Sequence, residues 1–105
     1  MVGTGKLDPM RPSEALALHR TQIREIAMRH RVSDVRVFGS ALHGDDTTES
    51  DLDLLVDTLP GATLFDLGGL QDELQELLGL PVDVLTLKDL PIKFRYKVAS
   101  KARPV

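Results

Sequence analysis

The sequence contains no cysteine, and no part of it resembles a membrane span. The absence of cysteine excludes disulfide bonds, cysteine zinc sites and thiol nucleophiles, and we expect a cytoplasmic protein. No run approaches the roughly eighteen apolar residues that a membrane-spanning helix needs, and the first residues lack the apolar core of a signal peptide. We therefore expect no membrane partner.

Basic residues are missing from the middle of the chain. No lysine or arginine lies between Ser40 and Leu87, although this segment holds eleven of the sixteen acidic residues. So acidic a segment would repel a polyanionic ligand, and we expect phosphates to bind there only together with divalent metal ions. The net charge of −3 argues against general nucleic-acid binding, which usually needs a basic surface.

The length of 105 residues fits one domain and leaves no room for a separate substrate-binding domain. We expect residues 1–12 to form a flexible N-terminal lead-in and residues 13–105 to form the domain. Helical spacing of apolar residues predicts helices at 13–31, with Ser13 as the cap, at 63–78 and at 91–102. Short apolar segments predict strands at 35–38, 51–56 and 81–85. This order indicates an α/β (α+β) fold with a small mixed β-sheet and flanking helices.

The most informative motif combines a glycine-serine turn with two closely spaced acids. Gly39 and Ser40 follow the first predicted strand, and Asp51 and Asp53 follow a spacer of ten residues. Glycine lets the backbone approach a ligand closely, and the serine amide and hydroxyl can both donate to a phosphate. Residues two apart in a strand point to the same face, so the two carboxylates can share a metal ion. The spacing is typical of metal-dependent nucleotidyl transfer.

A third acid, Asp83, lies on the third predicted strand and could complete the metal site. On its own it would be interpreted as a solvated edge-strand residue, but the other two acids and the glycine-serine turn favour a role in the site. Carboxylate oxygens favour Mg²⁺ or Mn²⁺.

These residues carry a family resemblance. The segment VFGSALHGDDTTESDLDLLVD, residues 37–57, resembles the signature of minimal nucleotidyltransferases, small members of the DNA polymerase β-like superfamily. With the helix and the PVDV strand that follow, the resemblance extends from Val35 to Leu85. It implies the minimal nucleotidyltransferase fold and an antitoxin that transfers AMP from ATP to a tyrosine hydroxyl of a cognate HEPN-domain ribonuclease toxin.

The resemblance also implies roles for individual residues. Gly39 and Ser40 would hold the nucleotide phosphates, Asp51 and Asp53 would bind two Mg²⁺ ions, and Asp83 would be the third acid of the active site. Most relatives carry arginine three residues after the serine, whereas this chain has His43. Histidine is only partly charged near neutral pH, so His43 either contacts phosphate weakly or is a surface residue without a ligand.

Two other functions use the same residues. The chain could be a non-catalytic antitoxin that neutralises its toxin by binding, or a nucleotidyltransferase acting on a small molecule or an RNA end. The last predicted helix bears on the first alternative, because its apolar residues spread around more of the helix than one core contact needs. Those residues either form a partner surface or pack into the core on two sides. Lys93, Lys97 and Lys101 form a basic ridge on this helix.

Overall fold

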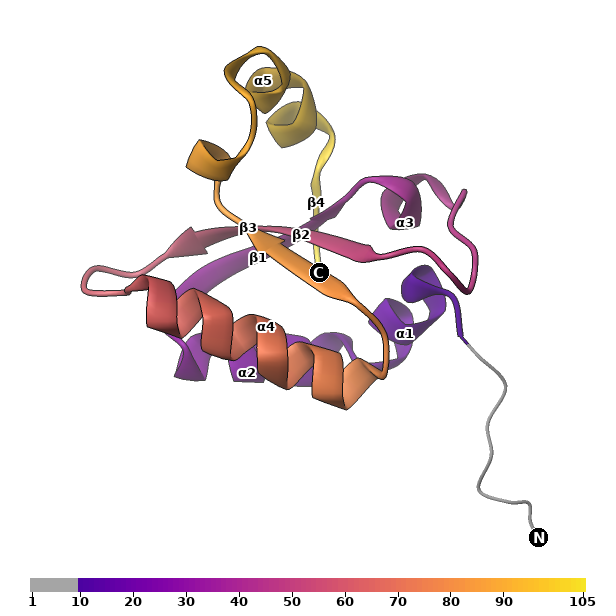
Figure 1. The fold of residues 1–105 in the computed structure, drawn as a ribbon, viewed down its shortest axis with the longest axis horizontal. Helices are drawn as coiled ribbons and strands as arrows, with labels where there is room; N and C mark the ends of the chain where they lie inside the picture. Colours follow the sequence, from indigo (N-terminus) through magenta and orange to yellow (C-terminus); the bar gives the residue numbers. More distant parts are fainter. Residues whose placement is uncertain (1–9) are drawn as a thin grey trace, which may run out of the picture.

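The structure, a computed structural model, describes residues 10–105. One sheet contains all four described strands in the order β3-β2-β1-β4 (Figure 1). The strands are β1 (Val32–Phe38), β2 (Leu52–Thr58), β3 (Val82–Leu85) and β4 (Arg103–Pro104). β1 pairs antiparallel with β2 and β4, and β2 pairs parallel with β3, so the predicted mixed sheet is confirmed.

The helices are distributed unequally over the sheet. They are α1 (Pro12–Leu18), α2 (Arg20–Arg29), α3 (Ser40–His43), α4 (Leu64–Leu78) and α5 (Ile92–Lys101), with a short 3-10 helix, η1 (Leu87–Asp89). Figure 1 shows α2 and α4 side by side on one face, whereas α5 stands on the opposite side of the sheet. The main core lies between the sheet and the α2–α4 layer, with Ile23, Leu54, Leu70 and Leu74 fully buried in it. Within residues 10–105, no helix has the length and apolar character to span a bilayer.

The predicted first helix, 13–31, is wrong in one respect, because the structure divides it into α1 and α2. His19 interrupts it with φ −117° and ψ 22°, well away from helical values. The hydrogen bonds from the His19 amide to Ala15 and from the Ile23 amide to His19 are retained across the break. The apolar spacing therefore continues through it, and the pattern alone could not reveal the change in backbone direction.

The N-terminal boundary also differs from the prediction. Residues 1–9 of the expected lead-in lie outside the described residues, but Arg11 caps α1 and Pro12 is its buried first residue. Ser13 is therefore not the cap. Proline suits this position because a first-turn residue needs no amide donor.

Helices α2 and α4 pack closely at a glycine. A Cβ on Gly69 would lie 3.0 Å from Cε1 of His30, so glycine lets the histidine ring lie against α4. His30 Nε2 then lies 2.8 Å from Glu73 Oε1, and Arg29 Nη2 donates to Glu73 Oε2 at 2.8 Å. The surface of α4 is thus tied to α2 by hydrogen bonds.

The C-terminal part contains a strand, β4, that the sequence did not predict. After α5 the chain returns to the sheet as β4, where the Val105 amide donates to the Val35 carbonyl at 2.9 Å. No α5 residue is buried, and Ile92 and Tyr96 are 78% and 85% exposed. The view that α5 packs into the core on two sides is therefore wrong.

Candidate active site

Two of the three predicted acids are direct neighbours in the sheet. Asp53 on β2 pairs in parallel register with Asp83 on β3, so both side chains leave the same face of the sheet. Phe38, the last residue of β1, lies opposite Asp53 on its other side. The sequence had predicted Asp51 inside the second strand, but in the structure it lies one residue before β2. Asp51 and Asp83 are exposed, and Asp53 is half-buried.

Gly39 brings the glycine-serine turn into contact with these acids. Its φ of 77° lies in the left-handed region, and a Cβ at this position would lie 2.5 Å from Asp53 Oδ2. Such a contact is closer than van der Waals distance, so a side chain at residue 39 would displace either the turn or the carboxylate. The glycine is thus required both by the backbone conformation and by the close approach of Asp53.

The surroundings of Asp53 disfavour its ionised form. Burial, the negative charges of Asp83 and Asp51, and a hydrogen bond with Asp83 together raise the pKa of Asp53 from 3.8 to about 6, and burial has the largest effect. A carboxyl group in such surroundings is stabilised in its charged form by a nearby cation. A bound metal ion would therefore stabilise the ionised form of Asp53.

The donor set fits a divalent metal ion in charge and ligand type. Carboxylate oxygens are the ligands that Mg²⁺ and Mn²⁺ prefer. No three acidic or histidine side chains within residues 10–105 already converge as a complete metal site. Asp51 and Asp83 are exposed, however, and exposed side chains change rotamer readily, so both can turn toward an ion beside Asp53.

Ser40 and His43 begin and end the short helix α3, which follows Gly39 directly. Ser40 is half-buried, and its carbonyl accepts a hydrogen bond from the Asp45 amide at 3.1 Å. His43 is exposed at the end of α3 and lines a cleft between α3 and α5. The structure thus places Gly39 beside the acids and His43 a helical turn further from them.

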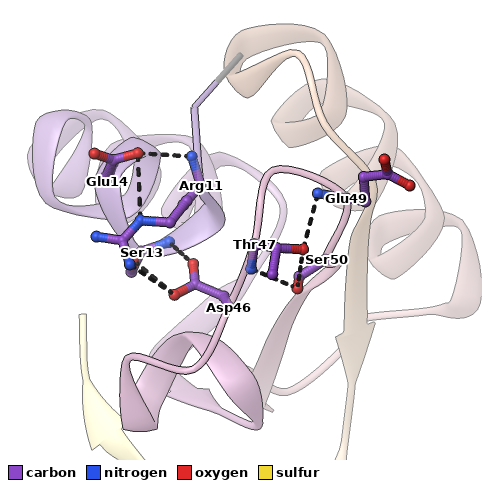
Figure 2. Close-up of polar contacts among 7 residues, drawn as sticks. All are labelled: Arg11, Ser13, Glu14, Asp46, Thr47, Glu49 and Ser50. Carbon is purple, nitrogen blue, oxygen red and sulfur yellow. Dashed lines mark hydrogen bonds and ion pairs between the residues drawn. The ribbon is translucent and has the colours of Figure 1, made fainter.

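The loop between α3 and β2 is fixed by a residue that sequence analysis missed. Asp46 is the buried charged residue of the described chain, and it accepts hydrogen bonds from the Ser13 amide at 2.7 Å and the Ser13 hydroxyl at 3.0 Å (Figure 2). Burial opposes its ionisation, but these hydrogen bonds and the charge of Arg11 outweigh that effect and lower the pKa of Asp46.

A turn then delivers the chain to the acids. The Thr47 amide donates to Ser50 Oγ at 2.9 Å (Figure 2). The Ser50 amide donates back to the Thr47 carbonyl at 3.0 Å. Asp51 follows this turn directly. The segment between the glycine-serine turn and the acids is therefore held to α1 by the hydrogen bonds of Asp46 and forms a hydrogen-bonded turn between Thr47 and Ser50.

Comparison with known proteins agrees with this arrangement. The family model described as "Polymerase beta, Nucleotidyltransferase" matches residues 21–105. A Thermococcus cleftensis protein named protein adenylyltransferase MntA is 36% identical over 75 residues, which cover 71% of this chain and 73% of that protein. A Methanocaldococcus jannaschii protein, inferred to be a protein adenylyltransferase, is 34% identical over 83 residues, which cover 79% of this chain and 89% of that protein.

Solved structures share the fold. The structure of a protein assigned as a minimal nucleotidyltransferase superimposes with a TM-score of 0.80 at 36% identity, covering 96% of this chain and 99% of that one. A toxin–antitoxin crystal structure with AMP-PNP superimposes with a TM-score of 0.67 at 19% identity, covering 80% of this chain and 69% of that one, which shows a common fold alone. The resemblance seen in the sequence is confirmed: the chain belongs to the polymerase β-type nucleotidyltransferase family and has the minimal nucleotidyltransferase fold.

Proposed function

We propose that this nucleotidyltransferase is an antitoxin that transfers AMP from ATP to a tyrosine hydroxyl of a cognate HEPN-domain toxin. The observation that carries the proposal is the meeting of Gly39 with the Asp53–Asp83 pair at one edge of the sheet. Relatives named as protein adenylyltransferases, and the shared fold of toxin–antitoxin structures, support a protein acceptor.

The proposed reaction is a single displacement at phosphorus. The tyrosine oxygen forms a bond to the α-phosphorus of ATP, the bond to the bridging oxygen of the β-phosphate breaks, and pyrophosphate leaves. Gly39 allows the phosphates to approach the backbone, and the Ser40 amide and hydroxyl donate to their oxygens. Asp51, Asp53 and Asp83 would hold Mg²⁺, which when bound neutralises phosphate charge and increases the acidity of the hydroxyl. Asp83, the exposed member of the pair, can alternatively accept the tyrosine proton.

In this proposal the toxin docks as an independent folded partner. Helix α5 offers the surface for this. Ile92 and Tyr96 are largely exposed on it, and Phe94 is 48% exposed. Exposed apolar residues grouped on one helix are typical of protein interaction sites. We therefore assign these three residues to the toxin-binding surface.

The test uses the purified protein, ATP, Mg²⁺ and the toxin encoded beside its gene, with intact mass spectrometry of the toxin as the measurement. We expect addition of AMP by the wild type and none by Asp53→Ala or Asp51→Ala. Asp72→Ala is the matched control, because Asp72 is an exposed acid on α4, away from the site. Toxin inhibition without an adduct would contradict the enzymatic proposal and favour neutralisation by binding alone.

A further inference from the structure

A cleft separates α3 from α5 on the side of the sheet opposite the main core. One part, of about 310 Å³, is lined by Gly39, Leu42, His43, Lys97 and Lys101 among others. A second part, of about 460 Å³, shares Leu42, His43 and Lys101 and adds Arg103. We name the two parts together the α3–α5 cleft.

The cleft gathers positive charge without counter-ions. Lys97, Lys101 and Arg103 line it, and no acidic residue does. Within residues 10–105, none of these three cations forms an ion pair. Lys97 and Lys101 are four residues apart on one helix, where like charges repel. A bound anion would relieve this repulsion, so the cleft is electrostatically suited to an anionic ligand.

The other two basic residues of α5, Lys93 and Arg95, are engaged elsewhere. Lys93 lies over the Phe94 ring at 5.6 Å from its centroid, and it does not line the cleft. Arg95 donates to the Leu90 and Lys88 carbonyls, both at 2.9 Å. Lys97 and Lys101 therefore differ from the other basic residues of α5, because they line the cleft and form no ion pair among the described residues.

The cleft adjoins the acids at Gly39. This glycine lines the cleft, and it also contacts Asp53, since a Cβ on it would meet Asp53 Oδ2 at 2.5 Å. Phe38, also part of the lining, lies opposite Asp53 in the sheet. A phosphate chain that has one end at the acids can thus pass over Gly39 into the cleft.

We propose that Lys97 and Lys101 bind the β- and γ-phosphates of the nucleotide, so that α5 supplies the cations absent from residues 41–87. This inference rests on the proposed function, because it assigns the phosphate-binding residues of the same site. His43, at the rim, adds charge only when protonated. Ammonium groups are suited to this task because each donates up to three hydrogen bonds to phosphate oxygens.

Isothermal titration calorimetry with Mg²⁺ and either ATP or AMP tests the assignment. Loss of one charged hydrogen-bond donor should raise the Kd for ATP about tenfold in Lys97→Gln and in Lys101→Gln. The Kd for AMP, which lacks the outer phosphates, should change less than about twofold. Lys93→Gln is the matched control and should bind ATP like the wild type. Adding His43→Arg to the double lysine variant should restore part of the affinity, because arginine places a permanent cation at the rim.

The outcomes separate this inference from the proposed function. Equal ATP affinity of the wild type and the double variant, with unchanged thermal unfolding, would overturn the lysine assignment while leaving adenylyl transfer intact. If the wild type neither binds ATP nor modifies the toxin, the proposed function fails, and titration with inorganic tripolyphosphate then decides the role of the cleft. Tripolyphosphate binding that disappears in the double variant supports an oligophosphate site, and no binding by the wild type rejects it.

Discussion

Replacing Asp46 should destabilise the domain even though Asp46 is not one of the proposed catalytic acids. Its carboxylate accepts the Ser13 amide, one of the donors in the first turn of α1 that have no partner within the helix. It also accepts the Ser13 hydroxyl at 3.0 Å. Asp46→Ala removes both acceptors and leaves the amide unsatisfied.

The magnitude follows from these contacts. Hydrogen bonds to a charged group contribute about 1.5 to 3 kcal/mol each, and loss of a helix-capping acceptor costs about 1 kcal/mol. The ion pair with Arg11 spans 3.9 Å and involves a partly exposed arginine, so it adds little. Because both hydrogen bonds end on the same carboxylate, their contributions do not add in full, and we expect about 2 to 3 kcal/mol for Asp46→Ala. This corresponds to a fall in Tm of about 10 to 15 °C in a domain of this size.

The effect should depend on pH in a defined direction. Because the pKa of Asp46 is lowered in the folded protein from its ordinary value of 3.8, its ionised form stabilises the fold at pH values above 3.8. This contribution is lost as the pH falls through the folded-state pKa. The stability difference between the wild type and Asp46→Asn should therefore be constant from about pH 5 to 8 and shrink below about pH 4.

Urea unfolding of the wild type, Asp46→Ala, Asp46→Asn and Ser13→Ala, followed by circular dichroism, measures these differences. Asp45→Asn is the matched control, because Asp45 is the exposed neighbour. A double-mutant cycle between residues 13 and 46 isolates the contact between them. The reasoning would be refuted if Asp46→Ala were as stable as the wild type at pH 7, or if the Asp46→Asn difference were the same at pH 3.

Three further predictions concern the site and α5. Burial and neighbouring acids raise the pKa of Asp53 to about 6, so the folded protein favours the protonated form of this carboxyl group. The stabilisation that protonation provides is complete below about pH 3.8 and is lost as the pH rises through about 6. Thermal unfolding in EDTA at pH 7.5 should therefore show Asp53→Asn more stable than the wild type by about 1 to 2 kcal/mol after solvent screening, with no difference below about pH 4. Gly39→Ala should lower stability by about 1 to 3 kcal/mol and abolish AMP transfer, because its Cβ would meet Asp53 Oδ2 at 2.5 Å; wild-type transfer rates would contradict the close approach. Ile92→Ser and Tyr96→Ser should weaken toxin binding at least about tenfold in titrations with little change in Tm, since both side chains are exposed; a lower Tm would instead show that they support the fold.

Features with short-range signals could be predicted from the sequence. Asp53 and Asp83 could be placed on strands because each lies in a short apolar segment, and the structure pairs the two residues in register. Helix α4 was placed within one residue, because Thr63 precedes it and Gly79 ends it with φ 69°. In each case, neighbouring residues determine the backbone conformation.

Features that depend on distant contacts could not be predicted. Asp46 and Ser13 are 33 residues apart, and nothing in either local segment indicates their pairing. Strand β4 has only two residues, too few to produce an alternating pattern, and it exists because β1 offers a free edge. The apolar residues of α5 spread around much of the helix, so the sequence alone left open whether they pack into the core or stay exposed.

The same limitation affected the interpretation of charge. In the sequence, most acids occupy the middle of the chain and the cations its two ends, which led us to expect that phosphates bind only together with divalent metal ions. In the fold, α5 crosses to the face of the sheet that carries Asp53, and Lys97 and Lys101 line a cleft bordered by Gly39. Asp53 and Lys97, more than forty residues apart in the sequence, thus both lie near Gly39. A metal requirement remains a prediction for the acids, but the phosphates beyond them meet lysines, so ATP affinity should depend on both groups independently.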